Sequence, residues 1–257
     1  RKVEEMNEKE KYLFDLNGYL VIPNALTQQQ IKALNAEVDR RIETECEPDM
    51  RTHRFASLLG WNNEYRNLID NKSITPYLKE LLGESFRLDH EYLDVIRSGK
   101  GPIGTRLHGG ATPYRSSEYF HFSNEKMHNG LSVVAYNLKD VEPMDGGFGC
   151  VPGSHKSNYA FPEDWKEMEE LEPIVKRVTG PAGTAVIFTE ALTHGTLPWA
   201  GSDERRTIFF KYSPGPISWS AKYYDSNNYS NLSETQKVIL EGPNARYRGR
   251  DTNPVGY

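Results

Sequence analysis

Past residue 85 the chain alternates short, β-prone runs with tight clusters of glycine and proline. The runs, rich in β-branched and aromatic residues, are Phe86–Ile96, Leu131–Leu138, Ala185–Phe188, Thr193–Leu197 and Thr207–Tyr212. Short strands separated by such turns are typical of a β-barrel or a β-sandwich. The sequence contains no G-x-G-x-x-G motif between a strand and a helix, so a dinucleotide-binding fold is not expected.

The first 85 residues have a more helical pattern. Residues 4–16 predict a charged helix, and the apolar run Gly18–Pro23 predicts a short strand. Thr27 and Gln30 form a capping-box pattern at the start of an amphipathic helix over residues 28–45. Residues 73–82 predict a further helix, which ends at a glycine.

Together these patterns predict a mainly β fold with flanking helices, built as a double-stranded β-helix (a cupin-like jelly roll). We expect a single domain over residues 1–257. Its expected parts are a helical layer over residues 1–85, a jelly-roll core over residues 86–215 and a C-terminal extension over residues 216–257.

The composition argues against two classes of binding partner. Hydrophobic residues make up 37% and charged residues 26%, with a formal net charge of −5 and both signs mixed, so neither a nucleic acid nor a membrane is an expected partner. Cys46 and Cys150 belong to no C-x-x-C motif, which favours reduced thiols in a cytoplasmic protein. We expect a small-molecule substrate, and the oligomeric state stays open.

Two histidines stand at expected strand margins, where a jelly roll points side chains into its mouth. His108 follows a glycine-rich turn, and His194 lies in the expected strand Thr193–Leu197, in which Thr196 points to the same side. The returning strand follows Arg205 and Arg206, so it brings an arginine alongside. An arginine and a hydroxyl bind a carboxylate well, and a metal-binding histidine beside such an anchor suits a 2-oxoglutarate enzyme.

The order and spacing of these motifs resemble the phytanoyl-CoA dioxygenase family over about residues 14 to 215. The segments that carry the resemblance are Asn17–Pro23, Leu131–Leu138, Asp145–Gly147, Val151–Lys156, His194–Thr196 and Arg205–Arg206. The resemblance implies a C–H-oxidising enzyme that uses Fe(II), O2 and 2-oxoglutarate and releases succinate and CO2. It also implies that His108 and His194 bind iron, and that Arg205 and Thr196 bind 2-oxoglutarate.

One departure from the family leaves the third iron ligand open. The family's His-x-Asp motif reads His108-Gly109-Gly110 in this chain. Glu190 is the preferred replacement, because a helical turn would place it beside His194, and Glu118 is a second candidate. Alternatively a halide fills the gap, as in related radical halogenases, or the site has lost iron and the chain is a non-catalytic, cupin-like binding module.

Other positions complete the sequence hypotheses. His121 is an alternative to His108 as the first histidine ligand. Tyr136 and Asn137 are neighbours on an expected strand, so one of them is expected to face the interior and touch substrate or cosubstrate. Arg97 is a candidate partner for an anionic group of the substrate. His155, in a Pro-Gly-Ser-His-Lys turn, is expected to fix that turn by hydrogen bonding.

Overall fold

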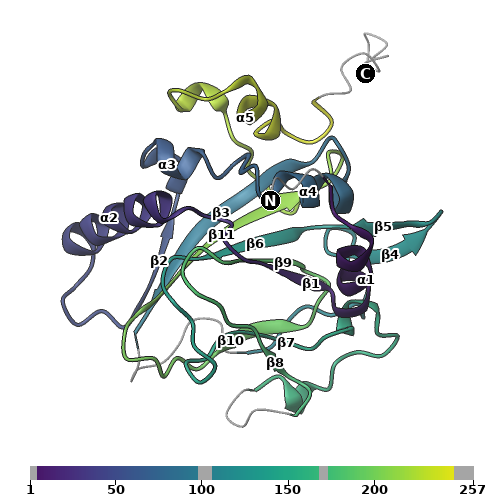
Figure 1. Ribbon diagram of the computed structural model, residues 1–257. Coiled ribbons are helices and arrows are strands. Elements are labelled where there is room, and N and C mark those ends of the chain that lie inside the picture. The colour runs from purple at the N-terminus through teal and green to yellow at the C-terminus, as the bar shows by residue number, and fades with distance from the viewer. Residues whose placement is uncertain (1–4, 98–105, 168–172, 246–257) are drawn as a thin grey trace.

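The computed structural model describes residues 5–97, 106–167 and 173–245. Within these residues a major and a minor sheet face each other, and helices cover the outside of the major sheet (Figure 1). The major sheet has the order β1-β9-β6-β11-β3-β2, the minor sheet has the order β10-β7-β8, and β4 pairs with β5 as a separate hairpin. All these pairs are antiparallel.

The strands and helices have the following bounds. The strands are β1 Tyr19–Ile22, β2 Thr52–Ala56, β3 Arg87–Ile96, β4 Phe120–Ser123, β5 Lys126–Asn129, β6 Ser132–Asn137, β7 Gly147–Cys150, β8 Lys176–Arg177, β9 Ala185–Thr189, β10 His194–Leu197 and β11 Arg205–Ser213. The α-helices are α1 Glu8–Asn17, α2 Gln28–Glu45, α3 Asn63–Arg66, α4 Thr75–Leu82 and α5 Glu234–Ile239.

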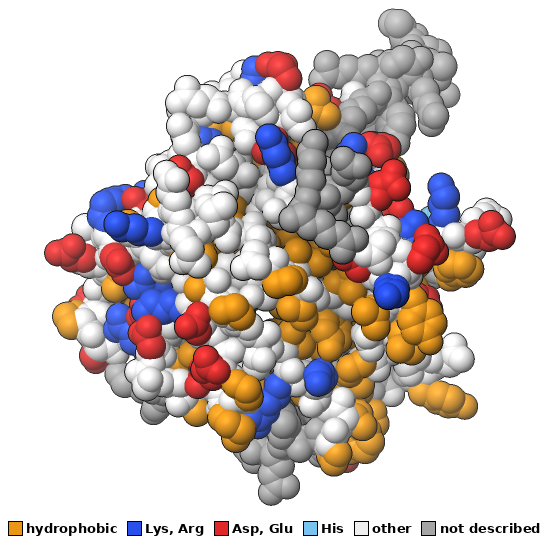
Figure 2. All heavy atoms as spheres, viewed as in Figure 1, with side chains coloured by type: hydrophobic (Ala, Val, Ile, Leu, Met, Phe, Trp, Pro, Cys, Tyr) orange, Lys and Arg blue, Asp and Glu red, His pale blue; other side chains and the backbone are white. Residues whose placement is uncertain are grey.

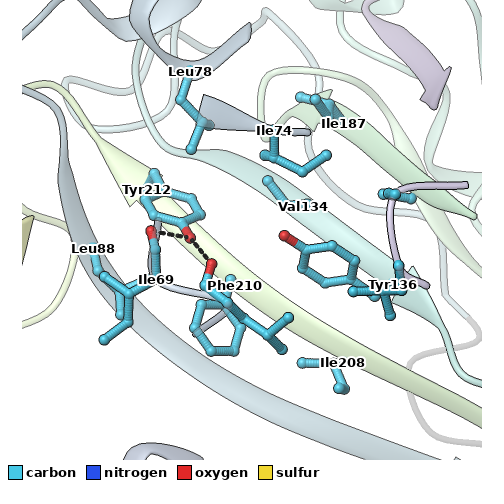
Figure 3. Packing of buried hydrophobic residues seen from close by; sticks show 14 of the residues in the cluster. Ile69, Ile74, Leu78, Leu88, Val134, Tyr136, Ile187, Ile208, Phe210 and Tyr212 are labelled. Atoms are coloured by element: carbon cyan, nitrogen blue, oxygen red, sulfur yellow. Dashed lines mark hydrogen bonds between the residues drawn. The ribbon is translucent and has the colours of Figure 1, made fainter. Parts of the chain in front are cut away.

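The outer face of the major sheet packs against the helices through an apolar core. Side chains from alternate positions of β6, β9 and β11 point into this core, where they meet Ile74 and Leu78 from the helical layer (Figure 3). Tyrosine hydroxyl groups there have hydrogen-bond partners. The Tyr212 hydroxyl, for example, lies 3.1 Å from the carbonyl oxygen of Leu68 and 3.0 Å from that of Ile69.

The inner face of the major sheet carries the alternate residues and faces the minor sheet. Val133, Phe188 and Phe209 form a second apolar cluster with Phe148 from β7. Because neighbouring strand residues point to opposite faces, the same strands build both the outer core and the barrel interior. The interior positions of β11 and β3 include the charged residues Arg205, Lys211 and Asp94, and the candidate site lies along them.

The sequence located the longer elements and missed several short ones. Helix α2 spans the predicted residues 28–45, and the Thr27–Gln30 capping box is present. The strands expected over residues 18–22, 86–96, 131–138, 185–188, 193–197 and 207–212 correspond to β1, β3, β6, β9, β10 and β11. The sequence did not predict β2, β4, β5, β7 and β8. Because β1 and β2 belong to the major sheet, the segment expected to form a helical layer also contributes two strands to that sheet.

The molecular surface in Figure 2 is charged on one side and hydrophobic on the other. Figure 2 shows charged side chains gathered over α2, where Arg41 bridges Glu37 and Glu45, and hydrophobic side chains over α1 and β1. Tyr12 and Val21 are among the exposed hydrophobic residues there. Both cysteines have free thiols. Among the described residues, no helix has the length and apolar character needed to cross a bilayer.

Candidate active site

His108 and His194 are held side by side by their own backbones. The amide of each donates to the carbonyl oxygen of the other, with N···O distances of 2.9 Å and 2.8 Å, so the two residues form an isolated antiparallel bridge. Their ring centroids lie 4.3 Å apart. The structure therefore brings together two histidines that are far apart in the sequence.

The hydrogen bonds of the two imidazoles fix which nitrogen faces the site. His108 Nδ1 lies 3.1 Å from the carbonyl oxygen of Arg106, and His194 Nδ1 lies 2.7 Å from that of Leu192. A carbonyl oxygen only accepts, so each Nδ1 carries the proton and each Nε2 presents a lone pair. Burial, with His108 nearby, lowers the pKa of His194 to about 4, so its ring is neutral near pH 7.

Glu190 joins the histidines through the turn between β9 and β10. The Leu192 amide donates to the carbonyl oxygen of Thr189 at 2.9 Å, which closes a β-turn rather than the helical turn suggested by the sequence. The turn places Glu190 Oε2 3.6 Å from His194 Nε2. One ligand atom from each of His108, Glu190 and His194 lies within 4.8 Å of the others.

The Glu190 carboxyl is ionised although it is buried. Burial opposes ionisation, but the ammonium of Lys211, with the two histidines, outweighs it and lowers the pKa of Glu190 to about 2. Lys211 Nζ lies 2.5 Å from Oε1, on the opposite side of the carboxylate from His194. Two imidazole nitrogens and one carboxylate form a donor set that suits Fe(II).

The backbone at Gly109 and Gly110 explains why no carboxylate stands in the family's usual place. Both residues have positive φ values, +83° and +102°, which disfavour any residue with a side chain. A Cβ on Gly109 would lie 2.4 Å from the carbonyl oxygen of Leu192, and one on Gly110 would lie 3.1 Å from Thr193 Oγ1. An aspartate at position 110 would therefore require the backbone to move.

Arg205 and Arg206 point to opposite faces of β11, as the alternation of a strand requires. Arg206 faces α2 and bonds to Asp39 and Glu204. Arg205 is buried in the interior, and its Nε and Nη1 atoms have no hydrogen-bond partner. Burial lowers its pKa to about 10, so the guanidinium remains charged near pH 7. An unsatisfied buried guanidinium fits an anionic ligand.

A cavity of about 510 Å³ connects the arginine to the histidines. Thr196 lines it together with Arg205, as the sequence predicted. The remaining lining residues, apart from His108 and His194, are Arg54, His90, Tyr92, Asp94, Phe148, Phe188, Gly195, Phe209, Lys211 and Trp219. The site thus combines one polar end with aromatic walls.

Sequence reasoning missed several cavity residues that carry charge. Lys211 contacts Glu190, and Arg54 pairs with Asp94 at 2.7 Å through both oxygens. Lys211 had a signal in the sequence, since it is a lone charge in the otherwise apolar run Thr207–Tyr212. Arg54 had none, because β2 itself was not predicted.

Two of the substrate-side candidates, Tyr136 and Arg97, lie outside the cavity. Tyr136 lies on the outer face of the sheet, in the core against the helices (Figure 3), because its neighbours Ala135 and Asn137 take the inward positions. Arg97 pairs with Glu204 at 2.9 Å and with the carbonyl oxygen of Met50, at the edge of the sheet rather than in the cavity. Asn137 has the inward register but is not among the cavity-lining residues.

The alternative ligand candidates lie elsewhere. Glu118 pairs with Arg115 at 3.1 Å. His121 stacks on His128 across the β4–β5 hairpin, with ring centroids 4.6 Å apart. Neither belongs to the cluster of His108, Glu190 and His194. The first histidine and the replacement carboxylate preferred from the sequence are therefore the residues that the fold brings together.

Comparison with known proteins gives several likenesses. The chain is 24% identical over 233 residues to the ectoine dioxygenase of Stutzerimonas stutzeri (strain A1501), which covers 78% of this chain and 74% of that protein. HygX from Streptomyces hygroscopicus, solved with nickel, 2-oxoglutarate and hygromycin B, superposes with a TM-score of 0.71 and 23% identity, covering 82% and 89% of the two chains.

A third likeness is to SnoN, a non-haem α-ketoglutarate-dependent epimerase from nogalamycin biosynthesis. It has a TM-score of 0.60 and 19% identity, covering 81% of this chain and 83% of that one. These likenesses confirm the predicted jelly-roll fold. The phytanoyl-CoA dioxygenase family model matches residues 14–207. The chain therefore belongs to the phytanoyl-CoA dioxygenase family and is an oxygenase-type enzyme.

Proposed function

We propose that the chain, an iron- and 2-oxoglutarate-dependent oxygenase by its family, oxidises a C–H bond of a small molecule. The reaction is a hydroxylation, or an oxidative cyclisation or desaturation, with release of succinate and CO2. One observation carries the proposal. One ligand atom from each of His108, Glu190 and His194 lies within 4.8 Å of the others, beside a cavity lined by Arg205, whose Nε and Nη1 atoms have no partner.

The proposed metal ligands and the proposed carboxylate anchor then have separate roles. His108, Glu190 and His194 would hold Fe(II), which would supply the activation of dioxygen and the cleavage of the C–H bond. Arg205 and Thr196 hold the distal carboxylate of 2-oxoglutarate, because a charged fork and a hydroxyl match a carboxylate. The aromatic walls, Phe209 among them, keep water from the reacting groups.

The size of the cavity and the relatives support a small-molecule substrate. A volume of about 510 Å³ falls in the usual range of small-molecule sites. The relatives are named for, or were solved with, compounds of this kind, ectoine and hygromycin B.

A radical halogenase is the second candidate function, and Gly110 is the observation that favours it. With no carboxylate at position 110, a halide has a place to bind. The position of Glu190 favours oxygenation instead, since its Oε2 lies on the histidine side of the cluster and already supplies an anionic ligand. The two functions make opposite predictions for Glu190 and chloride.

Metal binding and product analysis test the proposal. His108→Ala, Glu190→Ala and His194→Ala are each expected to abolish Fe(II) retention and succinate formation, because each removes one of three ligands. Glu118→Ala and His121→Ala are matched controls and are expected to retain both. Mass spectrometry of the product is expected to show no dependence on chloride.

Each alternative has its own outcome. Iron retained by Glu190→Ala, together with a chlorinated product, would establish the halogenase instead. Iron binding without release of succinate from 2-oxoglutarate under oxygen, across a screen of small molecules, would favour a binding module. Full turnover by His194→Ala would refute the metal site itself.

A further inference from the structure

Lys211 gives the two oxygens of Glu190 different partners. Its Nζ lies 2.5 Å from Oε1, whereas Oε2 lies 3.6 Å from Nε2 of His194. The carboxylate is 5% exposed, so bulk water does not compete for either oxygen. One oxygen is thus committed to an ammonium, and the other faces the imidazoles.

The backbone and the neighbours of Lys211 hold the ammonium in place. Lys211 lies in β11, the central strand of three, paired with His90 of β3 and Val133 of β6. Its Nζ lies 5.4 Å from the ring centroid of Tyr92, which adds a cation–π contact. The same strand begins at Arg205, so one rigid element carries both the cosubstrate arginine and the lysine.

A carboxylate binds a metal through one oxygen or through both. In a site of two histidines and one carboxylate, function requires open positions on the metal. A second oxygen from Glu190 would occupy one of the positions that 2-oxoglutarate or dioxygen needs. An ion pair on Oε1 opposes that second bond, because the oxygen would have to leave a buried, charge-assisted hydrogen bond.

We propose that Lys211 is a positioning residue that restricts Glu190 to one-oxygen ligation and so keeps metal positions open for 2-oxoglutarate. This inference rests on the proposed function, in which Glu190 is the third ligand. Lys211 acts through Glu190 and is assigned no contact with the substrate.

The cavity supplies a matched control in Arg54. Arg54 is also a cation over the ring of Tyr92, at 4.1 Å from the centroid, and it also pairs with a buried carboxylate. Its partner is Asp94, however, and not Glu190. Arg54→Met therefore removes a positive charge and an ion pair from the same cavity without releasing the proposed ligand.

The experiment separates metal binding from cosubstrate binding under anaerobic conditions. Co(II) binding is followed by visible absorption, and 2-oxoglutarate binding by the charge-transfer absorption of the Fe(II) protein. Lys211→Met is expected to retain Co(II) with a changed absorption spectrum, and to weaken 2-oxoglutarate affinity by roughly tenfold or more. Lys211→Arg, which keeps a cationic donor, is expected to restore that affinity, and Arg54→Met to leave the Co(II) spectrum unchanged.

The failures are distinguishable. If Lys211→Met matches the unsubstituted protein in both the spectrum and the 2-oxoglutarate affinity, the role of Lys211 is refuted while the metal site stands. If Glu190→Ala retains the metal, the proposed ligand set fails and this inference fails with it. Should Lys211→Met be insoluble, Lys211→Gln replaces it. A Gln variant with unaltered 2-oxoglutarate affinity refutes the role, and one with weakened affinity and a changed spectrum supports it.

Discussion

The two faces of the major sheet are made by the same strands and follow different rules. On the outer face, Ile208, Phe210 and Tyr212 are buried with apolar neighbours, and the Tyr212 hydroxyl has carbonyl partners. On the inner face of the same strand, Arg205 has unpartnered nitrogens, and Lys211 is paired with a buried carboxylate. Because side chains alternate along β11, one face of the strand packs in the core and the other carries residues of the candidate site.

The difference shows where the fold tolerates unfavourable groups. Burying a polar group without a partner destabilises the folded state, and a buried ion pair contributes little once its desolvation is counted. The outer-face positions Ile208, Phe210 and Tyr212 avoid both costs, while Arg205 and Lys211 on the inner face accept them beside a cavity. Local departures of this kind are expected at functional sites, because a ligand supplies the missing partners.

Removing Phe210 tests whether the outer face is purely structural. Phe210→Ala is expected to lower the free energy of unfolding by about 3–5 kcal/mol, because it empties a buried position in the core. Affinity for Co(II) should not change in the protein that remains folded. Urea unfolding and cobalt titration of the same sample check both expectations. A large loss of cobalt affinity would show that the two faces are not separable.

Arg205 and Arg206 provide a sharper comparison, since they are neighbours on opposite faces. Arg205→Ala is expected to raise the KM for 2-oxoglutarate by an amount corresponding to roughly 2–5 kcal/mol, because the carboxylate loses its buried charged partner. Arg206→Ala should affect KM much less and stability more, since Asp39 and Glu204 lose their partner. Succinate formation against 2-oxoglutarate concentration measures the first effect, and the reverse ranking would contradict the assignment.

His155 tests whether an unpartnered buried nitrogen can also be structural. Its Nε2 lies 2.9 Å from the carbonyl oxygen of Asp15, as expected for a turn-fixing residue, and its Nδ1 has no partner. Burial lowers the pKa of His155 to about 4, although the bond to Asp15 partly opposes this. The unfolded chain, with a pKa near 6.5, therefore takes up the proton first as the pH falls.

Stability is accordingly expected to be fully present above about pH 6.5 and to fall between pH 6.5 and 4, by about 3 kcal/mol from this residue. His155→Gln, which keeps an amide donor for Asp15, should show a correspondingly weaker pH dependence. Urea midpoints across this range provide the measurement. His194 contributes to both proteins, so the difference between them isolates His155. Equal slopes would mean that the pKa of His155 is not lowered by folding.

The elements that the sequence predicted carry their own local signals. Helix α2 has a capping box and an apolar period, and β11 is a long β-prone run. Strand β7 had neither, because Gly147 and Gly149 resemble a turn. Gly149 is required by packing and not by a turn, since a Cβ would lie 2.8 Å from the Leu197 side chain of the paired strand. Such close packing is visible only once the partner strand is known.

The sequence predicted those parts of the site in which a single short segment of the chain sets the direction of a side chain or the distance between two residues. The inward direction of Arg205 follows from strand alternation, and the nearness of Glu190 to His194 follows from any tight turn between them. The contact between Lys211 and Glu190 joins β11 to the turn after β9, and it depends on the register of two strand pairs through β6. Local sequence patterns do not encode that register.

The glycine pair that follows His108 also bears on how such a site changes over generations. A single codon change at position 110 would not simply restore the family's aspartate, because φ is +102° there and Thr193 lies close. A restored aspartate would also crowd a second anion against Glu190. A change from one ligand arrangement to the other therefore requires coordinated substitutions, and a single substitution at position 110 is not enough.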